Sequence, residues 1–418
     1  MGLTAAEKIL AAHAKLDRAK AGDVIRVEAD FSYADDISGP LIIEILERHR
    51  IDRLFDPSRL FLTSCMFSPS KDVVSAALAR RMREFAKRHG IALYEGGEMG
   101  IHHALVVEQG YALPGTLIAA GSSHACTAGA LGAFAIGLGS TDLAALWAIG
   151  KIHLQVPETI KLIIKGKLGR WASAKDLALH AISQLGLDGA RYRVLEFSGQ
   201  AVFSLDIEGR FTLANMAVEA GAKTAFIEVD QVVEHYLKGR AKGPYRIVED
   251  DPEAGYAKVI ELDVRDLEPL VALPPSPANV KPISEVGEVP LDQVYIGSCT
   301  NGWLGDLRTA AEIIKGKKAA PWVRLIVIPS TPGIYKQALQ EGLIETFLEA
   351  RAVVSVPSCG PCLGSYMGVL AAGERCLSTA NRNFMGRMGA KGSEVYLANP
   401  VVAAASAVAG RIVSPDAL

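Results

Sequence analysis

The chain has few cysteines, almost no net charge and no long apolar run. Only six of the 418 residues are cysteines, too few for the disulfide scaffold of a small secreted protein. Lys and Arg total 44 against 46 Asp and Glu, and this balance argues against nucleic acid as a main partner because phosphate binding needs clustered positive charge. The richest apolar stretch, 143–156, is broken by Lys151 and His153, so no segment reaches the roughly 20 apolar residues of a membrane span.

Apolar residues are nevertheless abundant. Half of the chain is hydrophobic, which is enough for several packed cores and excludes a disordered protein. The first residues do not read as a signal peptide. Thr4 and Glu7 instead form the capping box that begins a helix. We therefore expect a cytoplasmic enzyme or enzyme subunit that binds neither membrane nor nucleic acid.

Short apolar runs alternate with amphipathic segments along the chain. We expect strands at 60–66, 91–94, 117–120, 192–197, 293–296, 325–328 and 353–356, and helices at 72–89, 173–185, 212–220, 307–314 and 334–339. A second unit begins near Val156, and five prolines mark a linker between Leu273 and Pro290. This alternation predicts an α/β fold with parallel strands, in which ligands collect at the carboxyl ends of the strands.

Three of the six cysteines follow expected strands in glycine-flanked loops, and their spacing leaves three interpretations open. The run Cys359-Gly-Pro-Cys362 could be a thioredoxin-type redox pair, although only 56 residues follow it. The pair could instead bind structural zinc with Cys299 and Cys376, although zinc ribbons use two close pairs. The third interpretation is an iron–sulfur cluster held by Cys299, Cys359 and Cys362. Three thiolates would leave one iron open as a Lewis acid.

The residues around these cysteines form three motifs in a fixed order. They are 296–302 (IGSCTNG), 359–364 (CGPCLG) and 378–387 (STANRNFMGR), and they are accompanied by similar runs at 3–10, 215–222 and 396–400. Together they resemble the aconitase superfamily over essentially the whole chain, and within it the large subunits of 3-isopropylmalate dehydratase and homoaconitase.

The resemblance implies an architecture and an activity. It implies three α/β/α domains, at 1–155, 156–278 and 279–418, around a [4Fe–4S] cluster with three Cys ligands and one open iron. It further implies reversible dehydration of a small hydroxy di- or tricarboxylic acid. The family's swivel domain has no counterpart in the sequence, so a separate small subunit that carries it is expected.

Site residues follow from the same motifs. The resemblance makes Cys299, Cys359 and Cys362 the cluster ligands, and it places Asn215, Asn301 and Asn381 beside the cluster and substrate. Arg382 and Arg387 would clamp substrate carboxylates, for which the planar guanidinium is suited. Their alternative is an ordinary surface ion pair.

Four histidine and carboxylate positions are carried over in the same way. Glu219 is expected to pair with His103 as a catalytic carboxylate–imidazole pair, whereas His102 is expected only to pack. Asp35 and Asp36 stand where the family has substrate-facing residues, and their alternative is a capped turn.

Two positions depart from the family pattern. Ser122 replaces an aspartate two residues before the expected catalytic His124, and Ser64-Cys65 replaces an Asp-His pair. Cys65 could donate the proton that the missing histidine supplies, or it could be a buried filler. Cys126 is expected to be a small buried residue. Two functions therefore stay open: the large subunit of a hydro-lyase, and a cluster-binding paralogue whose hydratase chemistry is altered or lost.

Overall fold

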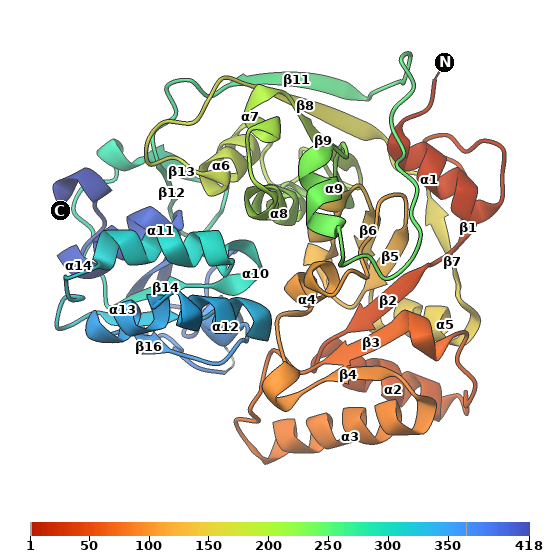
Figure 1. Cartoon of the computed structure of the whole chain (residues 1–418), viewed down its shortest axis with the longest axis horizontal. Coiled ribbons are helices and arrows are strands. Elements are labelled where there is room, and N and C mark those ends of the chain that lie inside the picture. Colours follow the sequence, from red (N-terminus) through yellow and green to blue (C-terminus); the bar gives the residue numbers. More distant parts are fainter. Residues whose placement is uncertain (1, 365) are drawn as a thin grey trace.

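The computed structural model describes residues 2–364 and 366–418, and three predominantly parallel sheets follow one another along the chain (Figure 1). The first has the strand order β4-β3-β2-β5-β6. Its strands are β2 (Phe31–Ala34), β3 (Leu60–Thr63), β4 (Ala92–Tyr94), β5 (Leu117–Ala120) and β6 (Phe134–Gly137), with helices α2 (Ser38–Arg48), α3 (Val73–His89), α4 (His102–Glu108) and α5 (Ser140–Ile149). A separate pair, β1 (Val24–Glu28) and β7 (Lys151–Gln155), is antiparallel.

Both faces of the first sheet are buried, as parallel sheets require. Along β3, Phe61 points into one apolar cluster while Leu60 and Leu62 point into another. One face is covered by α2, which packs against α3 and α5. The other face carries α4 and a 3₁₀ segment at Ser123–Leu131, and this segment packs against the second sheet.

The second sheet has the order β10-β9-β8-β11 and is parallel throughout. It comprises β8 (Thr159–Lys165), β9 (Val194–Ser198), β10 (Thr224–Ile227) and β11 (Lys258–Asp263), with α6 (Ala174–Leu185), α7 (Gln200–Phe203), α8 (Ile207–Met216) and α9 (Gln231–Leu237). A short 3₁₀ turn at Ala217–Ala220 extends α8, so the expected helix at 212–220 begins five residues earlier than its pattern suggested.

The third sheet has seven strands in the order β13-β12-β18-β17-β14-β15-β16. They are β12 (Leu270–Ala272), β13 (Val280–Pro282), β14 (Gln293–Ile296), β15 (Arg324–Val327), β16 (Val353–Val354), β17 (Arg375–Ser378) and β18 (Glu394–Leu397), with α10 (Ser298–Asn301), α11 (Leu304–Ile314), α12 (Pro332–Gln340), α13 (Leu343–Glu349) and α14 (Pro400–Ala409). Strand β12 is antiparallel to both neighbours, and the other strands are parallel.

The proline-rich segment is not only a linker. Residues 280–282 form β13, at the edge of the third sheet, where a proline is tolerated because one side of the strand has no hydrogen-bonding neighbour. Strand β12 also joins this sheet, although it precedes the expected boundary at 278. The exact division into domains remains a prediction.

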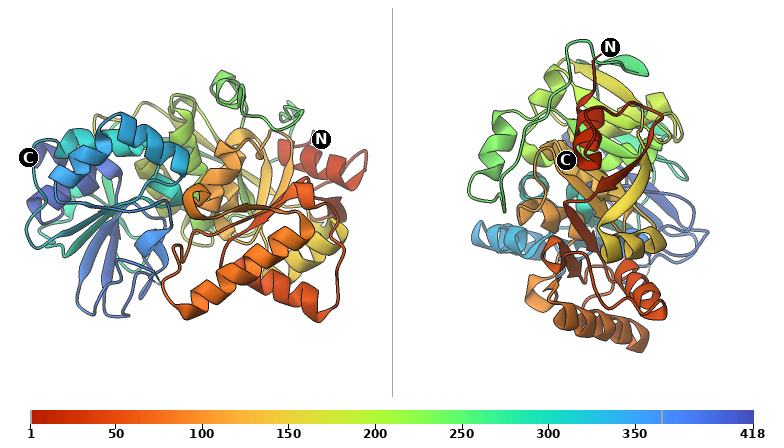
Figure 2. Two further views of the ribbon diagram at one scale, coloured as in Figure 1. Left: turned by 60° about the horizontal axis from the view of Figure 1, so that its bottom comes forward. Right: turned by 90° about the vertical axis from the view of Figure 1, so that its right-hand side faces the viewer.

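The chain starts with the capping box expected from its sequence. Thr4 Oγ1 accepts a hydrogen bond from the Glu7 amide, and Glu7 Oε2 accepts one from the Thr4 amide, at the start of α1 (Ala5–Ala14). Within the described residues, no helix is long and apolar enough to cross a membrane. One apolar cluster runs through all three sheets, so the three parts in Figure 2 pack around a common centre.

Candidate active site

The three expected cluster cysteines lie together in loops of the third sheet. Cys299 is in α10, directly after β14, and Cys359 and Cys362 follow β16. The Asn381 side chain contacts two of the sulfurs, with Nδ2 at 3.4 Å from Cys299 Sγ and Oδ1 at 3.9 Å from Cys362 Sγ. Gly360 shapes the second loop, because its φ is +52° and a Cβ would meet Ile328 at 2.3 Å.

The surroundings of the cysteines fit an iron–sulfur cluster. Asn215 Nδ2 lies 3.2 Å from Cys299 Sγ, so two side-chain amides donate to this one sulfur, an arrangement that suits a thiolate. Burial raises the pKa of Cys299 to about 12, so its thiolate form needs a bound cation. All three cysteines are buried and free of disulfides.

The same geometry disfavours structural zinc. Among the described residues, the three sulfurs do not all lie within 4.8 Å of one another, whereas thiolates on one tetrahedral zinc ion are about 3.8 Å apart. Cys376 lies at the start of β17, paired with Gln293, and its sulfur contacts Gln293 and Leu377. Cys376 therefore lies beside the first residue of β14, whereas Cys299 follows the last residue of that strand. Cys376 is at the wrong end of the sheet to complete the set of ligands.

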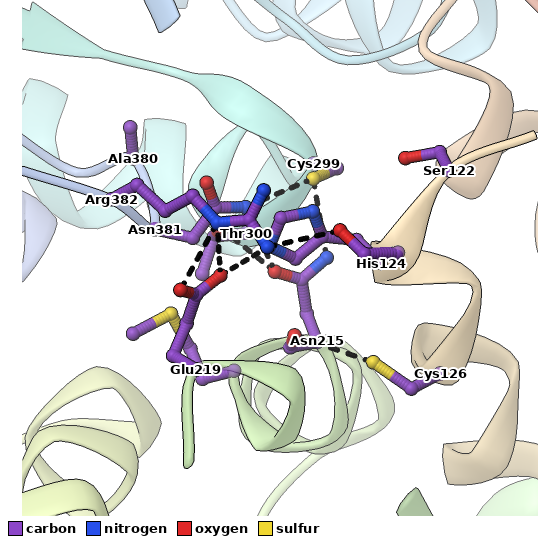
Figure 3. Close-up of polar contacts among 12 residues, drawn as sticks. Ser122, His124, Cys126, Asn215, Glu219, Cys299, Thr300, Ala380, Asn381 and Arg382 are labelled. Carbon is purple, nitrogen blue, oxygen red and sulfur yellow. Dashed lines mark hydrogen bonds and ion pairs between the residues drawn. The ribbon is translucent and has the colours of Figure 1, made fainter. Parts of the chain in front are cut away.

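The Asn215 side chain makes four hydrogen bonds to protein groups, one of them to a cysteine sulfur (Figure 3). Its Nδ2 donates to Thr127 Oγ1 at 2.8 Å as well as to Cys299, and its Oδ1 accepts from Thr300 and Asn381. These four interactions use the whole hydrogen-bonding capacity of a primary amide. All of its hydrogen-bonding groups are thus engaged by protein atoms, and a substrate-binding role for Asn215 stays a prediction.

The carboxylate–imidazole pair is built from Glu219 and His124, not from Glu219 and His103. His124 Nε2 lies 2.7 Å from Glu219 Oε1, and Arg382 Nε lies 2.8 Å from the same oxygen. Figure 3 shows the three side chains gathered from three different parts of the fold. His124 comes from the 3₁₀ segment of the first sheet, Glu219 follows α8, and Arg382 follows β17.

Charge and burial set the protonation of this pair. Burial lowers the pKa of His124 to about 4, with Arg382 acting in the same direction and the bond to Glu219 opposing both. Burial raises the pKa of Glu219, but its bonds to His124 and Arg382 outweigh this and leave it below the usual value. Near neutral pH, a neutral imidazole therefore faces an ionised carboxylate, which can only accept. The Nε2 atom of His124 carries the proton and Nδ1 is left as a base.

His103 has different partners from those expected. Its Nδ1 lies 2.9 Å from the Tyr33 hydroxyl and its Nε2 lies 2.8 Å from Ser122 Oγ. The sequence motif could not distinguish His103 from His124, because either could reach a glutamate about one hundred residues away in the chain. The serine at 122 thus contacts His103, and His124 keeps a carboxylate partner despite that substitution.

The remaining predicted polar residues fall into two groups. Arg387 Nη2 lies 3.8 Å from Cys362 Sγ, and its buried Nε has no hydrogen-bond partner among residues 2–364 and 366–418, so these residues leave a donor beside the cysteines. Asn301 instead donates to Thr212 and Asp306. Asn301, Thr212 and Asp306 line a cavity of about 570 Å³ next to α11.

Asp35 and Asp36 have the contacts of turn-capping residues, which is the alternative considered from the sequence. Asp35 Oδ1 accepts from the amides of Ile37 and Ser38. Asp36 accepts from three successive amides, at 65, 66 and 67.

Cys65 is fully buried, with its sulfur 3.2 Å from His102 Nδ1, so His102 does more than pack. Cys126 is buried too, as expected, and its sulfur contacts the Asn215 carbonyl.

One buried residue that supports the loop of Asn381 and Arg382 has no signal in the sequence. Lys175 is fully buried and its Nζ donates to the carbonyls of Thr379 and Ala380, at 2.9 and 2.5 Å. These carbonyls directly precede Asn381 and Arg382, so Lys175 fixes the loop that joins the cysteines to Glu219. The run 173–176 predicts only a helix start, and a lysine two residues after the capping serine gives no sign that it is buried.

Comparisons with known proteins agree with this arrangement. The aconitase family (aconitate hydratase) matches residues 7–290 and 284–410. The 3-isopropylmalate dehydratase large subunit of Syntrophus aciditrophicus is 52% identical over 419 residues, with 100% of both chains covered. The large subunit 1 of Pyrococcus furiosus 3-isopropylmalate dehydratase is 51% identical, with 99% of both chains covered.

A solved structure shares the fold. The holo-form of Thermococcus kodakaraensis aconitase X aligns with a TM-score of 0.52 at 15% identity, covering 90% of this chain and 88% of that one. At this identity the likeness concerns the fold alone. Together with the family match and the full-length relatives, it shows that this chain is an aconitase-type α/β protein and belongs to the aconitase family.

Proposed function

We propose that this chain is the large subunit of a [4Fe–4S] hydro-lyase that interconverts a hydroxy di- or tricarboxylic acid with its alkene, with 3-isopropylmalate, homoaconitate or a 2-alkylmalate as its substrate. One observation carries the proposal. Asn381 contacts the sulfurs of Cys299 and Cys362, while the next residue, Arg382, contacts Glu219. A single loop thus joins the cysteine triad to a proton-transfer pair, and a hydro-lyase needs both. The names of the full-length relatives support this choice of substrate.

Cys299, Cys359 and Cys362 would hold the cluster, which when bound supplies a Lewis acid that polarises the substrate hydroxyl and helps it leave. The chain's own residues would position the substrate. Arg387 has an unused buried Nε–H and Arg382 lies 23% exposed at the edge of the group, so both can donate to carboxylates. Ser123 orients Arg382 through a 3.0 Å hydrogen bond to Nη2.

His124 would move a proton. With Nε2–H donated to Glu219, its Nδ1 can accept a proton from the attacking water in the hydration direction and return it to the departing hydroxyl in the dehydration direction. Glu219 stabilises the resulting imidazolium, as a carboxylate does for other catalytic histidines. The base that removes the C–H proton is expected on a separate small subunit that carries the swivel domain. A cavity of about 310 Å³ is lined by Ser122, Ser123 and Val218, each of which is close in the chain to His124 or Glu219.

The cluster assignment is tested by reconstitution with iron and sulfide under anaerobic conditions. Serine variants of Cys299, Cys359 and Cys362 should each lose iron, sulfide and visible absorption, whereas Cys376→Ser should keep them, since it is equally buried but lies elsewhere. If Cys376→Ser loses as much iron as the other three variants, the ligand set is wrong.

The activity is tested with the reconstituted chain and its small subunit. The ultraviolet absorption of the conjugated alkene is followed with 3-isopropylmalate, homocitrate and 2-alkylmalates as substrates. Reversible interconversion of one of these acids with its alkene is the expected result. Failure with every acid, by a preparation that has a full cluster, would reject the hydro-lyase proposal.

A second candidate function is favoured by the loop after β3. Ser64 Oγ is buried without a hydrogen-bond partner, and burial raises the pKa of Cys65 well above its ordinary value, so this thiol is a poor proton donor. A cluster-binding paralogue without hydratase activity would fit these features. The double variant Ser64→Asp/Cys65→His distinguishes the two functions. A gain of activity from none supports the paralogue, and a loss from a measurable rate supports a retuned hydro-lyase.

A further inference from the structure

A second group of ligand-type atoms lies beside the cysteine triad and adjoins it, since the side chains of Cys65 and Cys359 are in contact. Asp35, Cys65 and His102 each direct one atom to the same place, and these three atoms all lie within 4.8 Å of one another. Cys65 Sγ is 3.2 Å from His102 Nδ1, and Asp35 Oδ2 is 3.9 Å from that nitrogen. All three residues are at least 97% buried. A carboxylate, a thiol and an imidazole are therefore enclosed together.

The fold brings these residues together from three consecutive elements. Asp35 follows β2, and Cys65 lies just past the end of the neighbouring parallel strand β3. His102 is the first residue of α4, whose preceding amide, that of Ile101, donates to Ser330 of the third sheet's loops. The group thus stands at the carboxyl edge of the first sheet, where it meets the third.

The loop that carries Cys65 is fixed on both sides. Its amide donates to Asp36 Oδ1 at 3.0 Å, and its carbonyl accepts from the Cys359 amide at 2.8 Å. Asp36 accepts two further amides from the same loop. A metal ligand needs this kind of support, because binding is strongest when the ligand does not have to be ordered first.

The charges of the group lack a cation. Asp35 uses Oδ1 for the turn at Ser38 and leaves Oδ2 facing His102. Among residues 2–364 and 366–418, no lysine or arginine forms an ion pair with Asp35. Within the part of the chain that the structure describes, the buried His102 Nε2 has no hydrogen bond, and the polar contacts of this imidazole there are made through Nδ1. Three electron-pair donors in a buried site are stabilised by a positive ion placed between them.

We propose that Asp35, Cys65 and His102 bind one divalent transition-metal ion, Zn²⁺ or Fe²⁺, in addition to the cluster. A mixed thiolate, imidazole and carboxylate set suits these two ions rather than Mg²⁺ or Ca²⁺. Three protein ligands leave a fourth position open, as in catalytic rather than structural zinc sites. The site does not depend on the proposed hydro-lyase activity.

Cobalt is the probe, because a Co²⁺–thiolate bond gives a charge-transfer absorption that oxygen and nitrogen ligands do not. The titration uses a chain in which Cys299, Cys359 and Cys362 are changed to serine, so that only Cys65, Cys126 and Cys376 remain. We expect one equivalent of Co²⁺ and a thiolate band. In this background Cys65→Ser should abolish the band, and His102→Gln should weaken binding about 100-fold or more. Cys376→Ser is the matched control and should change neither.

A band that survives Cys65→Ser, or the lack of any band in the parent chain, overturns the proposal. If the triple-serine chain does not fold, the same titration is made on the chain with its cluster assembled, where the three cluster cysteines are occupied. Iron and sulfide content measured before and after the titration must then stay constant while one Co²⁺ binds. Cobalt that binds only as iron is lost contradicts a separate site.

Discussion

The imidazole of His124 and the carboxylate of Glu219 form a buried hydrogen bond of 2.7 Å between the first and second sheets. Arg382 reaches the same carboxylate from the third sheet. Glu219 therefore contacts two side chains of the proposed site at once, His124 and Arg382. The site is shared by all three parts of the chain rather than built inside one of them.

Replacing Glu219 with glutamine should remove the negative charge that both side chains contact. The amide oxygen can still accept hydrogen bonds from His124 and Arg382, but a neutral amide cannot stabilise an imidazolium or pair with the guanidinium charge. We expect kcat to fall by about 10²- to 10⁴-fold with unchanged iron and sulfide content. Glu108→Gln, in a half-buried glutamate of α4, is the control and should keep most of the activity. A Glu219→Gln enzyme within a few-fold of the parent would show that the pair is only structural.

Arg387 should act mainly on substrate binding. Its unpartnered buried Nε is suited to a bidentate bond to a carboxylate, which the point charge of lysine cannot replace. In Arg387→Lys we expect KM to rise by about 10- to 100-fold, as loss of one charged hydrogen bond predicts, with a smaller change in kcat. Arg324→Lys removes an arginine of similar geometry that pairs with Glu374 on the surface, and its KM should not change. Equal KM values for the two variants would contradict the assignment.

The alternation of strands and helices was predictable because it depends on local patterns. Strand β5 matches its expected range, 117–120, and α6 starts one residue after its capping Ser173. The cysteine loops could be located for the same reason, since each follows an apolar run. The predicted ends of strands were less accurate. Strand β3 ends at Thr63 rather than at 66, because the amides from Cys65 onward donate to Asp36 and not to a neighbouring strand.

Tertiary partners could not be read from the chain in the same way. Glu219 bonds to His124 rather than to His103 because the 3₁₀ segment that carries His124 packs against α8, and Glu219 follows α8 directly. Asn215 matched a family motif, but only the structure shows its four contacts, one of them to a cysteine sulfur. These choices depend on which elements meet, and hydrophobic periodicity carries no such information.

Lys175 should contribute to stability as well as to the position of the Arg382 loop. In Lys175→Met the carbonyls of Thr379 and Ala380 lose their buried donor, at a cost of about 1–3 kcal/mol for each unsatisfied group. We expect the free energy of unfolding in urea to fall by about 2–5 kcal/mol. Lys238→Met, at the exposed end of α9, should change it by less than about 0.5 kcal/mol. A Lys175→Met chain as stable as this control would contradict the role.

The contact between His13 and Asp30 predicts a pH-dependent contribution to stability. The Nδ1 atom of His13 lies 2.6 Å from the Ile9 carbonyl and its Nε2 lies 2.6 Å from Asp30, so both nitrogens face acceptors and the imidazolium is favoured. Burial lowers the pKa of His13, but the bond and charge of Asp30 outweigh it and raise the pKa above 6.5. Because the folded pKa is the higher one, the stabilisation is complete below about pH 6.5 and is lost as the pH rises through the folded value.

His13→Gln should therefore be destabilised most near pH 6 and progressively less toward pH 9, relative to the parent chain. The difference should be about 1 kcal/mol or less, since the Asp30 side chain is 42% exposed. Urea unfolding at several pH values measures it, with the exposed His153→Gln on β7 as control. Below about pH 3.8 the same difference should shrink again as Asp30 takes up its proton. Burial raises the pKa of Asp30, but its hydrogen bond and charge interaction with His13 outweigh this and leave the pKa below its ordinary value. A difference that stays constant across this range would mean that the histidine contributes by packing and not by charge.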